Sequence, residues 1–165
     1  MSSVEVSGES AAGTPPVNAG EFRLEVVVLP VSDVDRAKEF YGGLGWRLDA
    51  DVARGEDLRL VQFTPPGSGC SIQFGTNIAS GAPGSVQSLY LSVADIEAAR
   101  ADLLTRGIEV GEVFHEGALG ARFRDPGRVP GPAPDRDTYG SFATFSDPDG
   151  NGWLLQEITT RLPGR

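Results

Sequence analysis

The segment TFSDPDGNGWLLQE, residues 144–157, carries three oxygen-bearing side chains at alternate positions: Asp147, Asp149 and Asn151. Alternating carboxylates and amides beside a glycine are typical of calcium-binding loops of the EF-hand kind. Such a loop also needs a later glutamate that binds the ion through both oxygens, and that residue is missing here. The run DPDG instead has the residue preferences of a type I turn. We therefore predict a turn between two strands rather than a metal site.

His115 is the only histidine of the chain, and Cys70 is the only cysteine. An imidazole titrates near neutral pH, so His115 is a candidate general acid or base. The alternative is a histidine at the end of a strand that bonds to backbone or water. One histidine cannot form a metal site by itself, and one cysteine cannot form an internal disulfide.

Residues 116–140 form a long segment rich in proline and glycine, and loops of this length are often lids or binding loops. Phe123 and Tyr139 are candidates to cover a cavity. Four arginines of the segment could clamp a carboxylate or phosphate: Arg122, Arg124, Arg128 and Arg136. The alternative is that they pair on the surface with nearby aspartates: Asp125, Asp135 and Asp137.

The elements that must position these residues come as a repeat. The run VLPVSDVDRAKEFYGGLGWRL, residues 28–48, aligns without a gap with YLSVADIEAARADLLTRGIEV, residues 90–110. In each copy an aspartate, Asp33 or Asp95, occupies the N-cap position before an apolar helix pattern. A glycine follows each pattern where a left-handed residue ends a helix. The alignment predicts two copies of one supersecondary unit.

Each copy continues with three strand patterns, so each unit is predicted as one strand, one helix and three further strands. The strands expected in the first unit span residues 23–31, 46–52, 58–64 and 71–75. Those expected in the second span residues 88–93, 108–115, 140–146 and 152–159.

The domain organisation follows from these patterns. Residues 1–20 contain no lysine or arginine and no long apolar run, so we expect a disordered leader rather than a secretory signal. We expect a single domain over residues 21–160, which divides into unit one at 22–75, a linker at 76–85 and unit two at 86–160.

The openings PVSDVDRAKEFY and SVADIEAARADL and the closing FSDPDGNGW resemble the vicinal oxygen chelate superfamily, and the resemblance covers residues 24–158. This superfamily includes glyoxalase I, extradiol dioxygenases and the bleomycin-resistance binding proteins. The resemblance implies an α+β fold in which two βαβββ repeats form curled mixed sheets around a central cavity. Fold alone does not determine activity.

The resemblance also implies four positions for metal ligands, which this chain fills with Val26, Gln73, Ser88 and Leu154. Val26 and Leu154 have no donor atom, and Gln73 and Ser88 are neutral, weak ligands for a divalent cation. We therefore expect no metal and no other cofactor, which argues against glyoxalase I or dioxygenase activity.

Alternation along each strand predicts which side chains face the cavity. The expected ligand-binding set is apolar and uncharged, with a few neutral polar groups: Val26, Gln73, Ser88, Tyr90, Leu154 and Gln156. A mostly apolar cavity with few polar anchors is typical of small-molecule sites. The alternative is a collapsed cavity in which these side chains satisfy one another.

We expect a metal-independent small-molecule-binding protein of the glyoxalase/bleomycin-resistance type, which would sequester a drug or metabolite. The net charge of -9 disfavours nucleic acid and membrane partners and favours a cationic ligand. The single cysteine fits a cytoplasmic protein, and the resemblance implies a homodimer. Two alternatives stay open: a metal-free lyase or isomerase that uses His115 or Tyr90 for proton transfer, and a member with a vestigial cavity.

Overall fold

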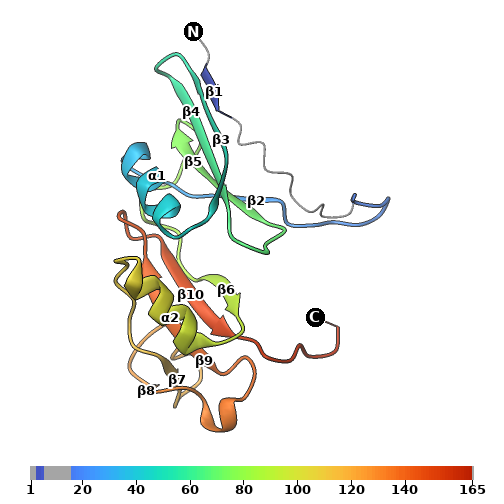
Figure 1. Ribbon diagram of the computed structural model, residues 1–165, viewed down its shortest axis with the longest axis vertical. Coiled ribbons are helices and arrows are strands. Elements are labelled where there is room, and N and C mark those ends of the chain that lie inside the picture. Colours follow the sequence, from blue (N-terminus) through green and yellow to red (C-terminus); the bar gives the residue numbers. More distant parts are fainter. Residues whose placement is uncertain (1–2, 6–15, 165) are drawn as a thin grey trace. The chain divides into compact units, whose positions relative to one another are not determined.

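A computed structural model describes residues 3–5 and 16–164 of the chain. The chain divides into two compact units, Met1–Ser85 and Val86–Arg165, and each contains a five-stranded sheet and an α-helix (Figure 1). The α+β class predicted from the sequence is confirmed.

The sheet of the first unit has the strand order β1-β3-β4-β5-β2. β2 runs parallel to β5, and the other neighbouring strands are antiparallel, so the sheet is mixed as expected. The elements of this unit are β1 (Ser3–Glu5), β2 (Val26–Val28), α1 (Val34–Gly43), β3 (Arg47–Arg54), β4 (Leu58–Thr64) and β5 (Ser71–Thr76).

The sheet of the second unit has the strand order β6-β10-β9-β7-β8. β6 runs parallel to β10, and the other pairs are antiparallel. The elements of this unit are β6 (Leu89–Val93), α2 (Ile96–Thr105), β7 (Phe114–Glu116), β8 (Arg128–Pro130), the 3-10 helix η1 (Pro134–Arg136), β9 (Ser141–Ser146) and β10 (Gly152–Glu157).

The repeat predicted from the sequence is confirmed by the helices, because α1 and α2 begin and end at positions that the repeat alignment pairs. The Asp33 carboxylate accepts one backbone N–H of the first helical turn and that of Asp95 accepts two, all at 3.0 Å, which satisfies donors that the helix itself leaves unpaired. Gly45 and Gly107 follow the helices with φ of 79° and 81°, a conformation that costs glycine little.

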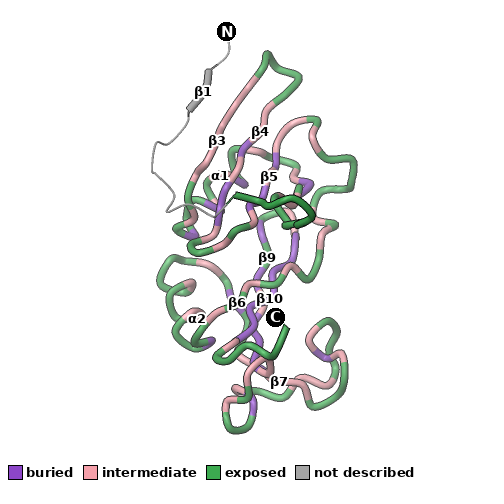
Figure 2. Tube along the Cα trace, turned by 90° about the vertical axis from the view of Figure 1, so that its right-hand side faces the viewer, coloured by how far each residue is buried: buried purple, intermediate pink, exposed green. Residues whose placement is uncertain are grey.

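The core of each unit lies where the helix meets the central strands. In unit 1, Tyr41 of α1 is fully buried, and its ring centroid lies 5.5 Å from those of Phe74 and Trp46. In unit 2, Ile96 of α2 is fully buried, and every residue of β10 is buried. Figure 2 shows the buried residues of both units concentrated in the central strands, with exposed residues along the connecting loops.

The turn predicted for the run DPDG, residues 147–150, is confirmed. Gly150 N–H donates to the Asp147 carbonyl at 3.0 Å, as in a type I turn. The Asp147 carboxylate accepts from the backbone N–H groups of Asp149 and Asn151 at 2.9 Å and from the Asn151 amide at 2.8 Å. These carboxylate oxygens therefore hold the loop closed and fix where β10 begins.

Three predictions about segments are corrected. The sequence predicts a strand over residues 108–115, but the strand there is only β7, Phe114–Glu116. Before it, the Gly111 N–H donates to the Thr144 carbonyl as an isolated hydrogen bond and not as part of a strand ladder. The long segment 116–140 contains β8, which pairs with β7. Within residues 1–20, expected to be disordered, Ser3–Glu5 pair with the edge of β3, since an edge strand offers free backbone groups; residues 1, 2 and 6–15 lie outside the described residues.

Within the described ranges, neither the length nor the apolar character of any helix suffices to cross a bilayer.

Candidate functional site

The first candidate surface is the side of the unit 1 sheet opposite α1. Phe63 and Phe74 face α1, because their ring centroids lie 6.4 and 5.5 Å from that of Tyr41. Side chains alternate along a strand, so the adjacent residues Gln62 and Gln73 lie on the opposite side. We call this side the polar face, and it carries Asp49, Gln62, Thr64, Ser71 and Gln73.

Two chains of hydrogen bonds on the polar face converge on Asp49. Gln73 Nε2 donates to Gln62 Oε1 at 2.7 Å, and Gln62 Nε2 donates to Asp49 Oδ2 at 3.1 Å. The Thr64 hydroxyl donates to the same carboxylate. The Ser71 hydroxyl lies 2.6 Å from the Thr64 oxygen, and it must be the donor because the Thr64 proton is already used.

The sequence predicts an uncharged lining. For this sheet the prediction is wrong, because the Asp49 carboxylate lies on the polar face. A shift of register between Leu48 and Ala50 marks a bulge, which turns the Asp49 carboxylate toward Gln62 and Thr64. Burial raises the pKa of the Asp49 carboxyl, but hydrogen bonds from Thr64, Arg47 and Gln62 outweigh burial and hold the pKa below its usual value. The group is therefore an anion at neutral pH, and Arg47 Nε partners it at 2.6 Å.

The second candidate surface is the side of the unit 2 sheet opposite α2. Glu157 of β10 faces α2, because its carboxylate accepts the Ile96 backbone N–H at 2.8 Å. Leu154 and Gln156 alternate with Glu157 and so lie on the other side, where Leu154 is paired with Tyr90. We call this side the aromatic face, and it carries Tyr90, Phe114, Phe142, Leu154 and Gln156.

Residues 116–130, which we call the arginine segment, fold back over the aromatic face. The Arg122 guanidinium carbon lies 4.6 Å from the Phe142 ring centroid, and that of Arg128 lies 4.2 Å from the Phe114 centroid. Cations over ring faces are attracted by the ring quadrupole, so these contacts hold the segment against the sheet. Beneath it, Phe114, Phe142 and Leu154 form a buried cluster.

Arg122 is further fixed by an ion pair with Glu116. Its Nε donates to Glu116 Oε1 at 2.6 Å, and its backbone N–H donates to Oε2 at 3.2 Å. Burial lowers the pKa of the Arg122 guanidinium, but hydrogen bonds to Glu116 and to the Tyr90 hydroxyl raise it further than burial lowers it. Arg122 thus links the arginine segment to β6 through Tyr90.

A hollow of about 200 Å³ opens between the arginine segment and the sheet. Its walls include Ser88, Arg122, Phe123, Arg128, Thr144 and Leu154. Beside it, the rings of Tyr90 and Phe123 lie 6.3 Å apart between centroids, and these side chains are 44% and 58% exposed. Two large aromatic side chains thus stay in solvent at the rim of a hollow, although similar rings nearby are buried.

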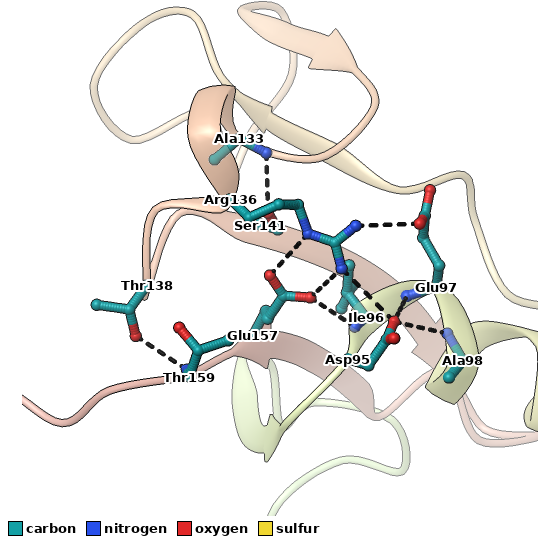
Figure 3. Close-up of polar contacts among 10 residues, drawn as sticks. All are labelled: Asp95, Ile96, Glu97, Ala98, Ala133, Arg136, Thr138, Ser141, Glu157 and Thr159. Atoms are coloured by element: carbon teal, nitrogen blue, oxygen red, sulfur yellow. Dashed lines mark hydrogen bonds and ion pairs between the residues drawn. The ribbon is translucent and has the colours of Figure 1, made fainter.

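The continuation of the arginine segment is anchored at Arg136, as Figure 3 shows. Arg136 Nη2 and Nε donate to the two carboxylate oxygens of Glu157 at 2.6 and 3.1 Å, and Nη1 donates to Glu97 at 3.0 Å. Glu157 is fully buried, and the Arg136 ion pair followed by the Ile96 N–H lowers its pKa against the effect of burial. One arginine therefore ties the loop before β9 to both α2 and β10.

The residues predicted to bind a ligand fall into two groups, one in each unit. Val26 and Gln73 lie on the polar face, where Val26 is paired with Ser71. Ser88 and Leu154 line the hollow, and Tyr90 stands at its rim. Gln156 also belongs to the aromatic face, but it is buried, and its amide donates to the Tyr139 carbonyl at 3.0 Å.

His115, the candidate acid or base, lies on the α2 side of its sheet. It is paired with Ser141, whereas its neighbour Phe114 is paired with Phe142 on the aromatic face. His115 Nδ1 lies 2.9 Å from the Gly131 carbonyl, which is the backbone contact weighed as the alternative from the sequence. The structure therefore does not bring His115 and Tyr90 to the same side of the sheet.

The side chains at the four metal positions do not fit a divalent cation. Val26 and Leu154 offer no donor atom, and Gln73 and Ser88 each offer only a neutral oxygen, which is a weak ligand for a divalent cation. Among the described residues, no three His, Cys, Asp or Glu side chains gather as a metal site would require. No step of a metal-dependent reaction can be assigned to these residues.

Comparison with known proteins identifies the superfamily to which this fold belongs. A family model described as the Glyoxalase/Bleomycin resistance protein/Dioxygenase superfamily matches residues 23–155. The chain belongs to this superfamily. The resemblance inferred from the repeat and the final turn is thereby confirmed. No curated protein sequence matches the chain.

Solved structures of the same superfamily resemble this member over most of its length. TnmS3, an antibiotic binding protein from Streptomyces sp. CB03234, is 30% identical, with a TM-score of 0.62 over 86% of this chain and 99% of TnmS3. A glyoxalase/bleomycin resistance protein from the same organism is 31% identical, with a TM-score of 0.58 over 81% and 99%. A superfamily member from Sphaerobacter thermophilus DSM 20745 is 26% identical, with a TM-score of 0.57 over 83% and 98%.

Proposed function

We propose that this protein binds and sequesters a small organic molecule on the aromatic face of unit 2, without a metal ion. The observation that carries the proposal is the exposed pair Tyr90 and Phe123 at the rim of the hollow. Exposed aromatic side chains that converge on a concave surface are the usual means of burying an apolar ligand. The antibiotic-binding description of TnmS3 supports the same class of ligand.

The size of the hollow limits what part of a ligand it holds. Pockets for drug-sized ligands usually enclose roughly 300–1,000 Å³, whereas this hollow encloses about 200 Å³. One ring system fits inside, and the remainder of a drug-sized molecule would extend over Tyr90 and Phe123. Both rings would then lose solvent contact. Burial of apolar surface contributes roughly 25 cal/mol of favourable binding free energy for each Å² removed from water.

The test is a ligand screen on protein purified in the presence of a chelator. Bleomycin and a panel of aromatic antibiotics are added singly, and the melting temperature and binding heat are measured, because a ligand of the folded state raises stability. A hit is then measured with Tyr90→Ala, Phe123→Ala and the control Phe22→Ala, whose ring is 99% exposed in unit 1. We expect each of the first two variants to weaken binding about tenfold and the control to leave it unchanged.

Two results would contradict the proposal. If no compound in the panel binds, the exposed pair has no role in sequestering such molecules. If a compound binds and is recovered chemically altered, the protein is an enzyme for it rather than a sequestering protein. Recovery of the unaltered compound after denaturation is the expected outcome.

A homodimer and a cytoplasmic location stay predictions. The dimer is implied by the family resemblance, and sedimentation at micromolar concentration tests it directly. A single monomeric species there would contradict it.

A further inference from the structure

Arg128 lines the hollow of unit 2, and its cross-strand partner Glu116 forms its ion pair with Arg122 instead. Arg128 Nε donates to the Ala121 carbonyl at 2.8 Å, and Nη2 donates to the Arg122 carbonyl at 3.1 Å. Within residues 16–164, no carboxylate forms an ion pair with the Arg128 side chain; the Asp125 carboxylate meets only its backbone N–H, at 3.4 Å. Arg128 is half-buried over the Phe114 ring, so its charge is partly shielded from water, and no carboxylate among the described residues forms an ion pair with it.

The neighbouring Arg122 shows the contrast. It too lines the hollow and stacks on a phenylalanine, but Glu116 pairs with it. The arginine segment as a whole carries three arginines against one glutamate and one aspartate. It is therefore locally cationic in a chain whose net charge is -9.

We propose that the ligand of this hollow is an aromatic anion, with its carboxylate, sulfonate or phenolate directed to Arg128 and its ring system against Phe123 and Tyr90. This inference rests on the proposed function and names the chemical class of its ligand. The proposed ligand is an anion, whereas the net charge of the chain leads us to expect a cation. The charges that line a site act on the ligand at contact distance, whereas distant surface charges are screened within about 10 Å.

The local geometry supports an anion in two ways. The Arg128 side chain is oriented in advance by its two carbonyl contacts, so a ligand does not have to order a flexible cation. A guanidinium that is partly removed from water also forms stronger charge-assisted hydrogen bonds than one on an open surface. The aromatic rim supplies apolar contact area that a simple inorganic anion could not use.

A matched pair of fluorescent probes isolates the charge. Anilinonaphthalene sulfonate and phenylnaphthylamine share one ring system and differ by the sulfonate group. We expect the wild-type protein to bind the sulfonate at least about tenfold more tightly than the neutral probe, as a charge-assisted hydrogen bond would give. This preference should shrink as salt is raised, because counterions screen the arginine.

Three variants assign the preference to Arg128. Arg128→Gln should weaken binding of the sulfonate about tenfold and leave the neutral probe unchanged, and Arg128→Lys should retain most of the preference. Arg124→Gln, in the same segment but exposed and outside the hollow, is the matched control and should bind both probes as wild type does. Near-ultraviolet circular dichroism checks that each variant is folded, because the sulfonate probe also binds loosened states.

The outcomes separate this inference from the proposed function. Equal affinity for the two probes, or an Arg128→Gln variant that keeps the preference, would overturn the anion site while the aromatic face still binds ligands. A fall in affinity for both probes in Arg128→Gln would show that Arg128 only holds the segment in place, and it would also overturn the assignment. Absence of binding by either probe overturns the anion site, and the antibiotic panel then decides the proposed function separately.

Discussion

Arg136 and Glu157 form two hydrogen bonds, at 2.6 and 3.1 Å, between the loop before β9 and the last residue of β10. Unit 1 contains a comparable contact, in which Arg59 of β4 pairs with Asp51 and with Asp35 in the first turn of α1. In both units, one arginine thus joins a carboxylate of the sheet to a carboxylate in the first turn of the helix. The positive end of the helix dipole also favours a negative charge in that turn.

Removing Glu157 should destabilise the protein more than any exposed charge does. Glu157→Ala leaves the buried Ile96 N–H without its acceptor and removes the buried carboxylate that pairs with Arg136, which keeps Glu97. We expect a loss of about 3 kcal/mol in the free energy of unfolding, which lowers the melting temperature by roughly 10 °C. Denaturant titration and calorimetry measure both quantities.

The matched control is the helix-surface pair Arg106 and Asp102, four residues apart on α2 and largely exposed. Arg106→Ala should change stability by no more than about 0.5 kcal/mol, since exposed pairs contribute little. If Glu157→Ala costs as little as the control, the ion pair between Arg136 and Glu157 does not stabilise this unit.

Asp51 should make the protein sensitive to acid. Hydrogen bonds from Arg59 and then from Lys38 lower its pKa from 3.8 to about 2 despite burial. A carboxyl whose folded pKa is depressed stabilises the protein above its unfolded pKa, and this contribution is lost as the pH falls from about 4 to about 2. We expect Asp51→Asn to lower stability at pH 7 by about 2 kcal/mol and to flatten its dependence on pH over that interval.

Unfolding curves collected between pH 7 and pH 2 test this expectation. Asp57→Asn, at an exposed position beyond β3, is the control and should keep the wild-type dependence on pH. An Asp51→Asn curve as steep as that of the wild type would contradict the role given to Arg59 and Lys38.

The sequence predicts the parts of this fold that depend on local signals. The N-cap aspartates, the glycines after the helices and the DPDG turn each act within a few residues, so their types suffice. Strand alternation likewise places Leu154 and Tyr90 on one face, because β10 has no bulge.

The rest depends on contacts between distant residues. The bulge at Asp49 interrupts alternation, and nothing in RLDADV marks it, so the charged centre of the polar face is missed. The arginine segment is stabilised by Phe114 and Phe142, and neither phenylalanine is distinguished from other core residues in the sequence. The cluster of arginines in residues 116–140 is the one feature of the sequence that indicates a binding role for this segment.

Gly75 and Gly43 should respond in opposite ways to alanine. A Cβ at Gly75 of β5 would lie 1.8 Å from the Arg59 carbonyl oxygen, and backbone cannot move aside cheaply. We expect Gly75→Ala to cost at least about 3 kcal/mol. Gly43, at the end of α1, has open space at that position, so Gly43→Ala should stabilise the protein by roughly 0.5–1 kcal/mol. Equal changes in melting temperature for the two variants would contradict the close pairing of β4 with β5 at Gly75.

Metal should have no effect on this superfamily member. Val26 and Leu154 cannot bind an ion, and Gln73 and Ser88 supply only neutral oxygens, which bind divalent cations weakly. We expect purified protein to contain less than about one-tenth of an equivalent of nickel, zinc or iron, and we expect the chelator EDTA to change neither its melting temperature nor its affinity for the sulfonate probe. Elemental analysis and titration with and without chelator measure these quantities. A stoichiometric metal, or binding lost with chelator and restored by zinc, would contradict the metal-independent site, because a resident ion stabilises only the state that binds it.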